Sequence, residues 1–291
     1  MLTTIETTLI YTVLLGSLYL LVSLGFSLIC GVLRIFHLGY AYLFVATIYL
    51  TWFFYHTLSL PLAVAIILMV ILQALISIAI YYGIIARYLK QEEIIITGLL
   101  LIALIADQVA NRFYPIQAAV YLPTTIMPGS IAVGSTNIAI QLIIAAALGI
   151  IVTALFVLFF LKTKTGLAVR AISYDLNTSK IMGIRVEQIY MFVMVLTILP
   201  VIIAMLMIAP VWAVDPTMGW GYMYTAILVS VMGGLGNIRG TIIASYIIGF
   251  VHAFASFVVA EPRLMNLAAL IVVVVMLIIR PQGIAKTESL W

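Results

Sequence analysis

The chain has 291 residues, of which 66% are hydrophobic and only 8% charged, and its formal net charge at pH 7 is +4. Soluble domains carry about 25% charged residues, so this composition excludes a water-soluble domain and predicts an integral membrane protein. The small net charge gives no sign of a nucleic-acid partner, and the single cysteine, Cys30, excludes a disulfide framework or a cysteine zinc site within one chain.

The first apolar stretch, MLTTIETTLIYTVLLGSLYLLVSLGFSLICGVLRIF, lacks the basic start of a signal peptide and a clear small-residue cleavage site. Its apolar run is also longer than that of a signal peptide. We therefore expect this stretch to remain in the mature chain as its first membrane helix.

The other apolar runs predict further membrane helices. A helix rises about 1.5 Å per residue and the hydrocarbon core is about 30 Å thick, so each span needs about 20 apolar residues. The sequence predicts an all-α fold, a polytopic bundle of eight to ten helices with nine as the best count, in one domain over residues 1–291. The spans lie near residues 9–33, 38–56, 62–86, 94–110, 137–161, 189–211, 222–237, 241–260 and 264–280. Those near 94–110, 222–237 and 264–280 are short enough to be broken or re-entrant helices.

The basic residues predict the orientation of these spans, because lysine and arginine stay on the cytoplasmic side of a membrane protein. With nine spans, all of the 13 basic residues except Arg112 and Arg263 fall on one side. We expect a multi-pass protein of the plasma or inner membrane, with its amino terminus outside and its carboxyl terminus in the cytoplasm.

The outer side then receives two irregular loops, residues 111–137 and 211–223. Proline and glycine in both loops are typical of turns. The first loop is long for a connection without structure of its own, so it is expected to be functional or partly ordered, with room for a short helix on the membrane surface.

The most polar stretch is the inner connection KTKTGLAVRAISYDLNTSKIMGIRVE, residues 162–187. Apolar residues recur in it at helical spacing: Leu167, Ala171 and Tyr174. Asp175 or Asn177 can cap a second short helix, which Gly183 would end in a left-handed conformation. The pattern predicts two short helices across the cytoplasmic face. They either simply connect two spans or form a docking element for a cytosolic partner.

A glycine-rich segment, GGLGNIRG, separates the spans near 222–237 and 241–260. It lacks the Lys-Ser/Thr of a phosphate-binding loop, so we predict a tight reversal between two membrane helices. The residues assigned to this reversal are Gly233, Gly234, Gly236, Asn237, Arg239 and Gly240. A contact to a cytosolic partner near Asn237 and Arg239 is the alternative.

Few polar residues lie at membrane depth, where an ionisable group is costly. Asp107 lies near the outer end of its span, either in a polar mouth or at an interfacial helix end, and His252 lies deeper, either on a solute path or bonded to a neighbouring helix. A proton- or sodium-coupled carrier usually needs buried carboxylates or unwound helices, which this sequence does not indicate. No catalytic constellation appears in the spans, so an intramembrane enzyme is set aside.

Several stretches, in the same order along the chain, are similar to one known family. GLAVRAISYDLNTSKIMGI resembles the cytoplasmic coupling loop of permeases in branched-chain amino-acid ABC importers, and LLGSLYLLVSLGFSLICGVLRI resembles their first span. Residues 214–250 resemble their carboxy-terminal signature, and IIRPQGI resembles their R-P-x-G-hydrophobic ending. The similarity covers nearly the whole chain, which looks like the shorter of the family's two types of inner-membrane permease.

One motif departs from the family pattern. Where the family typically has asparagine-phenylalanine-alanine-histidine-glycine, this chain has HLGYA, so Tyr40 and Ala41 replace the histidine and the glycine. The segment opens the second span, and we therefore add His37 and Tyr40 to Asp107 and His252 as candidate residues of a translocation path.

The resemblance implies partners for the chain. A solute-binding protein would deliver the solute outside, this permease and a second copy or homologue would form the path, and two ATPase subunits would bind the coupling loop. The residues implied in that contact are Gly166, Leu167, Arg170, Ala171, Tyr174, Asp175, Met182 and Gly183. The sequence has no G-x-x-x-x-G-K-[ST] motif, so we expect a non-catalytic chain without cofactor or metal, whose ATP is bound by the partner subunits.

Three functions remain after this comparison. The leading one is the path for branched-chain or other hydrophobic amino acids. The alternatives are a permease for another small solute, such as urea or amides, and a self-sufficient secondary carrier or channel.

Overall fold

Long uncharged runs form the helices of this chain, because a backbone inside lipid must satisfy its polar groups internally. The computed structural model describes residues 2–89, 91–114, 120–134 and 136–285. Its α-helices are α1 (Leu2–Leu33), α2 (Ala41–Trp52), α3 (Leu62–Ile80), α4 (Ala86–Tyr88), α5 (Glu92–Phe113), α6 (Ile140–Lys162), α7 (Lys164–Tyr174), α8 (Leu176–Ile181), α9 (Val186–Leu196), α10 (Ile198–Ile208), α11 (Met218–Gly233), α12 (Ile238–Phe257) and α13 (Met265–Ile279). Short turns of other pitch, η1 (Leu38–Tyr40), η2 (Phe53–Thr57), η3 (Tyr81–Ile85) and η4 (Pro262–Leu264), extend four of the spans.

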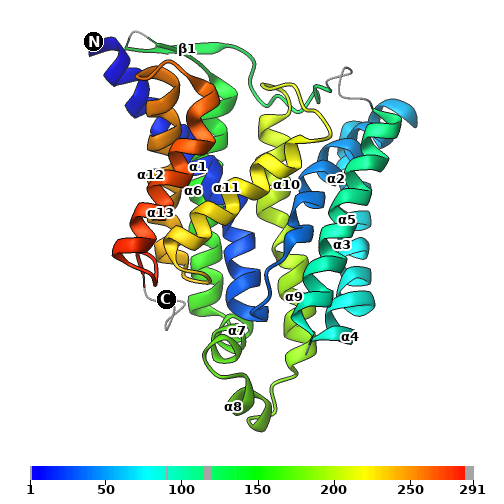
Figure 1. Ribbon diagram of the computed structural model, residues 1–291. Helices are drawn as coiled ribbons and strands as arrows, with labels where there is room; N and C mark the ends of the chain where they lie inside the picture. Colours follow the sequence, from blue (N-terminus) through cyan, green and yellow to red (C-terminus); the bar gives the residue numbers. More distant parts are fainter. Residues whose placement is uncertain (1, 90, 115–119, 135, 286–291) are drawn as a thin grey trace.

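The predicted all-α membrane bundle is confirmed (Figure 1). Eight helical segments of the described chain are long and apolar enough to cross a membrane. The remaining predicted span, near 222–237, corresponds to α11, whose 16 residues cover about 24 Å. The span expected near 94–110 is a full helix of 22 residues, so its predicted shortness was wrong.

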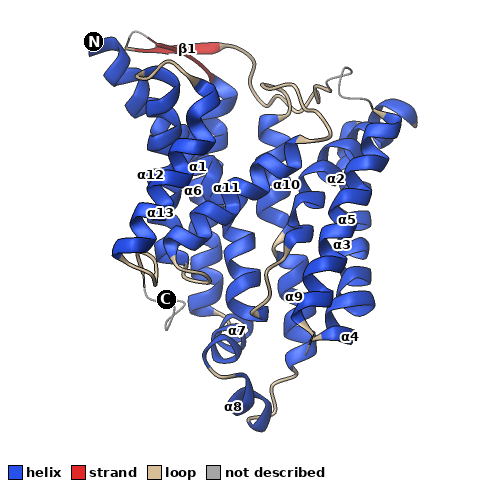
Figure 2. Cartoon of the chain, viewed as in Figure 1, coloured by secondary structure: helices blue, strands red, loops and turns tan. Residues whose placement is uncertain are grey.

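The bundle has two distinct ends (Figure 2). One end, called here the hairpin end, carries the two strands and the start of α1, where Thr7 Oγ1 lies 2.6 Å from Thr136 Oγ1. The other, called the α7–α8 end, carries those two helices. The helix order places every described basic residue at the α7–α8 end except Arg112 and Arg263, as the sequence predicted.

The long loop after α5 is partly ordered, as the sequence predicted. The sequence allowed a short helix on the membrane surface in this loop, but the described part forms an antiparallel hairpin instead. Its strands are β1 (Ser130–Val133) and β2 (Thr136–Ala139), with Val133 opposite Thr136. Before the hairpin, Val120 pairs with Val214, and this isolated bridge ties the loop to the connection between α10 and α11.

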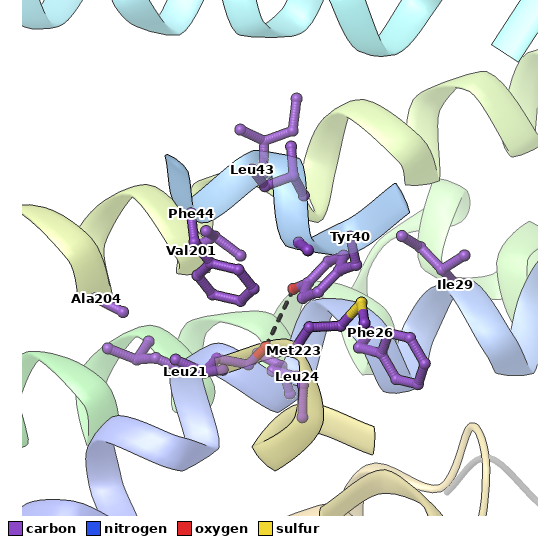
Figure 3. Close-up of a cluster of buried hydrophobic side chains, with 14 of the residues drawn as sticks. Leu21, Leu24, Phe26, Ile29, Tyr40, Leu43, Phe44, Val201, Ala204 and Met223 are labelled. Carbon is purple, nitrogen blue, oxygen red and sulfur yellow. Dashed lines mark hydrogen bonds between the residues drawn. The ribbon is translucent and has the colours of Figure 1, made fainter. Parts of the chain in front are cut away.

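α1 lies at the centre of the bundle and packs against α12, α11, α6 and α10. Small residues permit the closest of these contacts, because helices in lipid associate by tight backbone packing. A Cβ on Gly249 of α12 would lie 2.7 Å from Gly16 N on α1. Figure 3 shows the neighbouring core, where the rings of Phe26, Tyr40 and Phe44 lie among aliphatic side chains.

Candidate functional sites

The polar connection between α6 and α9 folds as the sequence predicts, into two short helices, α7 and α8. Thr163 caps α7 by accepting a hydrogen bond from Gly166 N at 3.0 Å. Asp175 caps α8 by accepting from the backbone N–H groups of Asn177 and Thr178. Gly183 follows α8 with φ +80°, a left-handed conformation that favours glycine.

The two faces of α7 have different surroundings. Val169 and Ile172 are buried against the bundle. Large apolar side chains of α7, α8 and the turn after them are exposed instead: Leu167 by 60%, Tyr174 by 70%, Ile181 by 86% and Met182 by 77%. These four side chains form an exposed apolar patch at the α7–α8 end of the described chain.

A groove of about 660 Å³ runs between α7 and α8. Five of the eight residues expected to contact an ATPase line this groove: Leu167, Ala171, Tyr174, Asp175 and Met182. The other lining residues are Lys164, Ala168, Thr178, Ser179 and Ile184. Of the other three expected residues, Gly166 packs inward, because a Cβ there would lie 2.5 Å from the backbone of Phe160. Gly183 is exposed beside the groove, and Arg170 is half-buried.

Arg34 joins α7 to the central helix. The residue follows α1 with φ +56°, an uncommon conformation for a side chain other than glycine. Its Nη2 donates to Ser173 O at 2.9 Å and to Tyr174 O at 3.4 Å, at the carboxyl end of α7. In the sequence, Arg34 is one of the basic residues that predict orientation, and its contact with α7 was not predicted. The sequence feature that could have revealed this contact is a basic residue directly after the end of α1.

The pKa of Asp175 gives α8 a pH dependence. The Thr178 hydroxyl, followed by the Thr178 amide, holds the pKa of this carboxyl below its usual range. The capping carboxylate therefore stabilises α8 at neutral pH, and this contribution is lost as the pH falls through the lowered pKa. We expect amide hydrogen exchange of residues 176–181, corrected for its intrinsic pH dependence, to accelerate in acid. Asp175→Asn keeps a capping side chain but does not titrate, so its exchange should stay flat; equal acid sensitivity in both proteins would contradict this role.

The predicted reversal lies between α11 and α12. Gly234 and Gly236 have φ of +97° and +83°, Asn237 Oδ1 accepts from Gly240 N at 3.0 Å, and Arg239 is exposed. The segment RPQGI, residues 280–284, packs beside this reversal, because Ile284 N donates a hydrogen bond to Met232 O at 2.9 Å. The sequence showed both motifs without indicating that they pair.

Gly233 and Gly240 face each other so closely that a Cβ on Gly240 would overlap Gly233 O. We expect Gly240→Ala to destabilise the protein by about 1–3 kcal/mol, as overpacking in a tight core does. Gly83→Ala is the control, because a Cβ at Gly83 meets nothing within 4 Å. A thermal-unfolding midpoint of Gly240→Ala equal to that of the control would show that the reversal tolerates a side chain.

The candidate path residues fall in three places, because His37 and Tyr40 lie together, with ring centroids 6.3 Å apart. Asp107 is 8% exposed, and its carboxylate accepts a hydrogen bond from the Trp220 side chain. His37 is buried and its two ring nitrogens have no partner in the described chain. Tyr40 donates to Val22 O at 3.1 Å. His252 Nδ1 lies 2.7 Å from Tyr19 OH, so it does bond a neighbouring helix.

Two cavities lie near opposite ends of the bundle. The larger, about 790 Å³, lies at the α7–α8 end and is lined by residues from α1, α5, α7 and the connections beside them, including Arg34, Phe36, Glu92 and Tyr174. The other, about 470 Å³, lies near the hairpin end between α1, α11, α12 and α13 and is lined by Tyr19, Tyr222 and His252 among others.

A row of aromatic rings joins these two cavities. Ring centroids lie 5.7 Å apart for Tyr222–Phe44, 5.4 Å for Phe44–Tyr40, 5.5 Å for Tyr40–Phe26 and 5.4 Å for Phe26–Phe36. Tyr222 lines one cavity and Phe36 the other. These ring contacts, called here the aromatic row, link the linings of the two cavities, and Figure 3 shows Phe26, Tyr40 and Phe44 of the row.

Comparisons with known proteins agree with this architecture. The profile of the family described as "Branched-chain amino acid transport system / permease component" matches residues 8–280. The chain is 25% identical over 166 residues to the high-affinity branched-chain amino acid transport system permease protein BraD of Pseudomonas aeruginosa, covering 55% of this chain and 54% of the relative. The matched region thus spans about half of that relative's length.

Among solved structures, the chain resembles one in PsaBC from Streptococcus pneumoniae in complex with Fab. The TM-score is 0.51, with 18% identity over 98% of this chain and 93% of the other. At this identity the likeness concerns the fold alone.

Proposed function

The chain belongs to the permease component family of branched-chain amino acid transport systems, and from this premise we propose that it forms the translocation path of an ATP-driven importer. In this proposal a solute-binding protein delivers a branched-chain or other hydrophobic amino acid at the hairpin end. Two permease chains, identical or homologous, enclose the path. ATPase subunits dock on α7 and α8 at the other end.

The observation that carries this proposal is the exposed groove of α7 and α8. It presents large apolar side chains at the end that holds nearly all of the basic residues, which is the end expected in the cytoplasm. Arg34, directly after α1, donates a hydrogen bond to the carboxyl end of α7. In this proposal a movement of α7 is therefore transmitted to α1. Because the sequence has no phosphate-binding loop, the proposal assigns ATP binding to other polypeptides.

The two cavities support a path with alternating access. In this proposal the aromatic row lies between the two cavities and keeps them apart in the resting state. Such a path passes a hydrophobic amino acid through mostly apolar surroundings without strong retention. Affinity then resides in the separate binding protein, which agrees with the few ionisable groups inside the spans.

Reconstitution tests the class of transporter. We expect the purified chain in liposomes to give no L-leucine uptake by itself. Uptake should appear only when the cognate ATPases, the binding protein and internal ATP are supplied. Solute flux through the chain alone would support a self-sufficient carrier or channel and overturn the importer.

The same liposomes test the solute class. L-leucine, L-isoleucine and L-valine should compete with one another, because the path and the family favour branched aliphatic side chains. Urea and acetamide are the matched probes for the alternative permease. Uptake of urea or acetamide that excess leucine does not reduce would favour that alternative.

A further inference from the structure

The larger of the two cavities, called here the Arg34 cavity, lies where four parts of the chain meet at the α7–α8 end. Its lining comes from the end of α1 with the segment after it, the first turns of α5, the carboxyl end of α7 and the reversal before α12. Its volume of about 790 Å³ falls within the usual range for small-molecule sites, about 300–1,000 Å³. The cavity is therefore large enough to hold a small solute.

Two opposite charges line this cavity. Among the residues of the described chain that line it, Arg34 and Glu92 are the charged ones, and both are exposed. The side chain of Glu92 makes no hydrogen bond or ion pair within the described residues, so it is not paired with Arg34. The cavity thus offers a cation and an anion that do not neutralise each other by direct contact.

The guanidinium of Arg34 retains donors for a further partner. Its Nη2 donates to the carbonyl groups of Ser173 and Tyr174. An arginine has five N–H donors, and the structure shows no hydrogen bond from Nε or Nη1 of Arg34 to a described residue. Hydrogen bonds from a guanidinium to a carboxylate are among the stronger ones in proteins. Arg34 can therefore hold α7 and bind a carboxylate at the same time.

Apolar side chains complete the lining. Ile35, Phe36, Ile96 and Leu235 give surface for a branched aliphatic group. A free aliphatic amino acid carries a carboxylate, an ammonium group and such a side chain on one carbon atom, and each of the three finds a matching group here. A simple anion would meet the like charge of Glu92, and a simple cation would meet that of Arg34. The lining therefore favours a zwitterion.

We propose that the Arg34 cavity is a release site for an aliphatic amino acid, in which Arg34 binds the carboxylate and Glu92 binds the ammonium group. The inference rests on the proposed function, since it takes the transported solute as the ligand. It goes further by giving that solute a stop between the aromatic row and the end where the ATPases dock. The solute and the carboxyl end of α7 then share one guanidinium.

Ile96 supplies a position for a reporter of occupancy. Its side chain lines the cavity one turn after Glu92 and is half-buried. Cys30→Ala removes the only natural thiol, and Ile96→Cys then places a single thiol in the cavity. In this reporter chain, purified and reconstituted, we expect L-leucine to slow modification by N-ethylmaleimide with a saturable concentration dependence. Failure of leucine, isoleucine and valine to protect the thiol would overturn the site.

Two neighbouring glutamates give a matched pair of variants. Glu92 and Glu93 both lie in the first turn of α5 and are exposed, but only Glu92 lines the cavity. In the reporter chain, Glu92→Gln should raise the leucine concentration for half protection about two- to fivefold, as the loss of an accessible ion pair does. Glu93→Gln should leave it unchanged. An equal effect of the two variants would contradict the role of Glu92.

Two analogues of leucine test which charge each residue binds. Isocaproate keeps the carboxylate and lacks the ammonium group, whereas isoamylamine keeps the ammonium group and lacks the carboxylate. Leucine should protect the thiol best. Glu92→Gln should weaken protection by leucine and isoamylamine but not by isocaproate, and Arg34→Gln should weaken protection by leucine and isocaproate but not by isoamylamine. A loss that is the same for all three compounds would be a structural effect and would contradict direct binding.

Uptake by the complete assembly separates this inference from the proposed function. Leucine uptake without thiol protection would refute the release site and leave the importer standing. Protection without ATP-driven uptake would support the site and refute the importer.

Discussion

Proline in place of Ala171 is expected to abolish co-purification of the ATPase subunits and, with it, ATP-driven uptake. Ala171 lies in the interior of α7, and its carbonyl accepts from Asp175 N at 3.0 Å. A proline there removes a helical N–H and clashes with the preceding turn, which costs about 3 kcal/mol or more. Because α7 presents Leu167 and Tyr174 to the groove, breaking it disperses the docking surface.

Ala171→Ser is the matched control for this change. Serine keeps the helical N–H at this position and adds only one hydroxyl group, so α7 should keep its geometry. The ATPases should still co-purify with this variant. Charge reversal by Arg170→Glu should also abolish co-purification. Intact pull-down of the ATPases by both Ala171→Pro and Arg170→Glu would remove the docking role of α7.

Loss of the Arg34 side chain is expected to uncouple transport from ATP hydrolysis without releasing the ATPases. Arg34 touches the carboxyl end of α7 from the end of α1, but it does not line the groove. Hydrogen bonds from a charged donor contribute about 1.5–3 kcal/mol, so their loss should lower the coupling between the two helices about tenfold or more. Leucine taken up per ATP hydrolysed, measured in proteoliposomes, should fall by that factor in Arg34→Ala.

Two further variants control this measurement. Arg34→Lys retains a cationic donor and should restore part of the coupling. Arg87→Ala removes another exposed basic residue from α4, which packs against η3 and α5 rather than α7, and should behave as the natural protein. Unchanged leucine uptake per ATP in Arg34→Ala would show that motion passes from α7 to the bundle by another route.

The strength of hydropathy as a signal explains why the spans could be predicted. Each crossing helix must be apolar over a fixed length, so long runs such as residues 140–162 leave little choice. The caps of α8 were also readable, because Asp175 and Gly183 act through local backbone chemistry. The hairpin of residues 130–139 was not, since its short strands carry weak signals and their neighbours are distant in sequence.

The candidate path could be predicted only in part, because its geometry depends on contacts between residues that are distant in the sequence. His252 was visible as a polar residue in an apolar run. Its partner Tyr19, and the rings of Phe44 and Tyr222, look like ordinary membrane-helix residues in the sequence. Their alignment between two cavities arises from the packing of α1, α2 and α11, which is a tertiary property.

Cysteine labelling across the membrane tests most directly whether α7 and α8 face the cytoplasm and bind the ATPases. In the Cys30→Ala background, Met182→Cys and Met127→Cys place exposed thiols at the α7–α8 end and the hairpin end, respectively. With a membrane-impermeant maleimide, intact cells should label only the Met127→Cys protein. Inside-out vesicles should label only the Met182→Cys protein, and bound ATPase should block that reaction. Labelling of the Met182→Cys protein in intact cells would contradict the account.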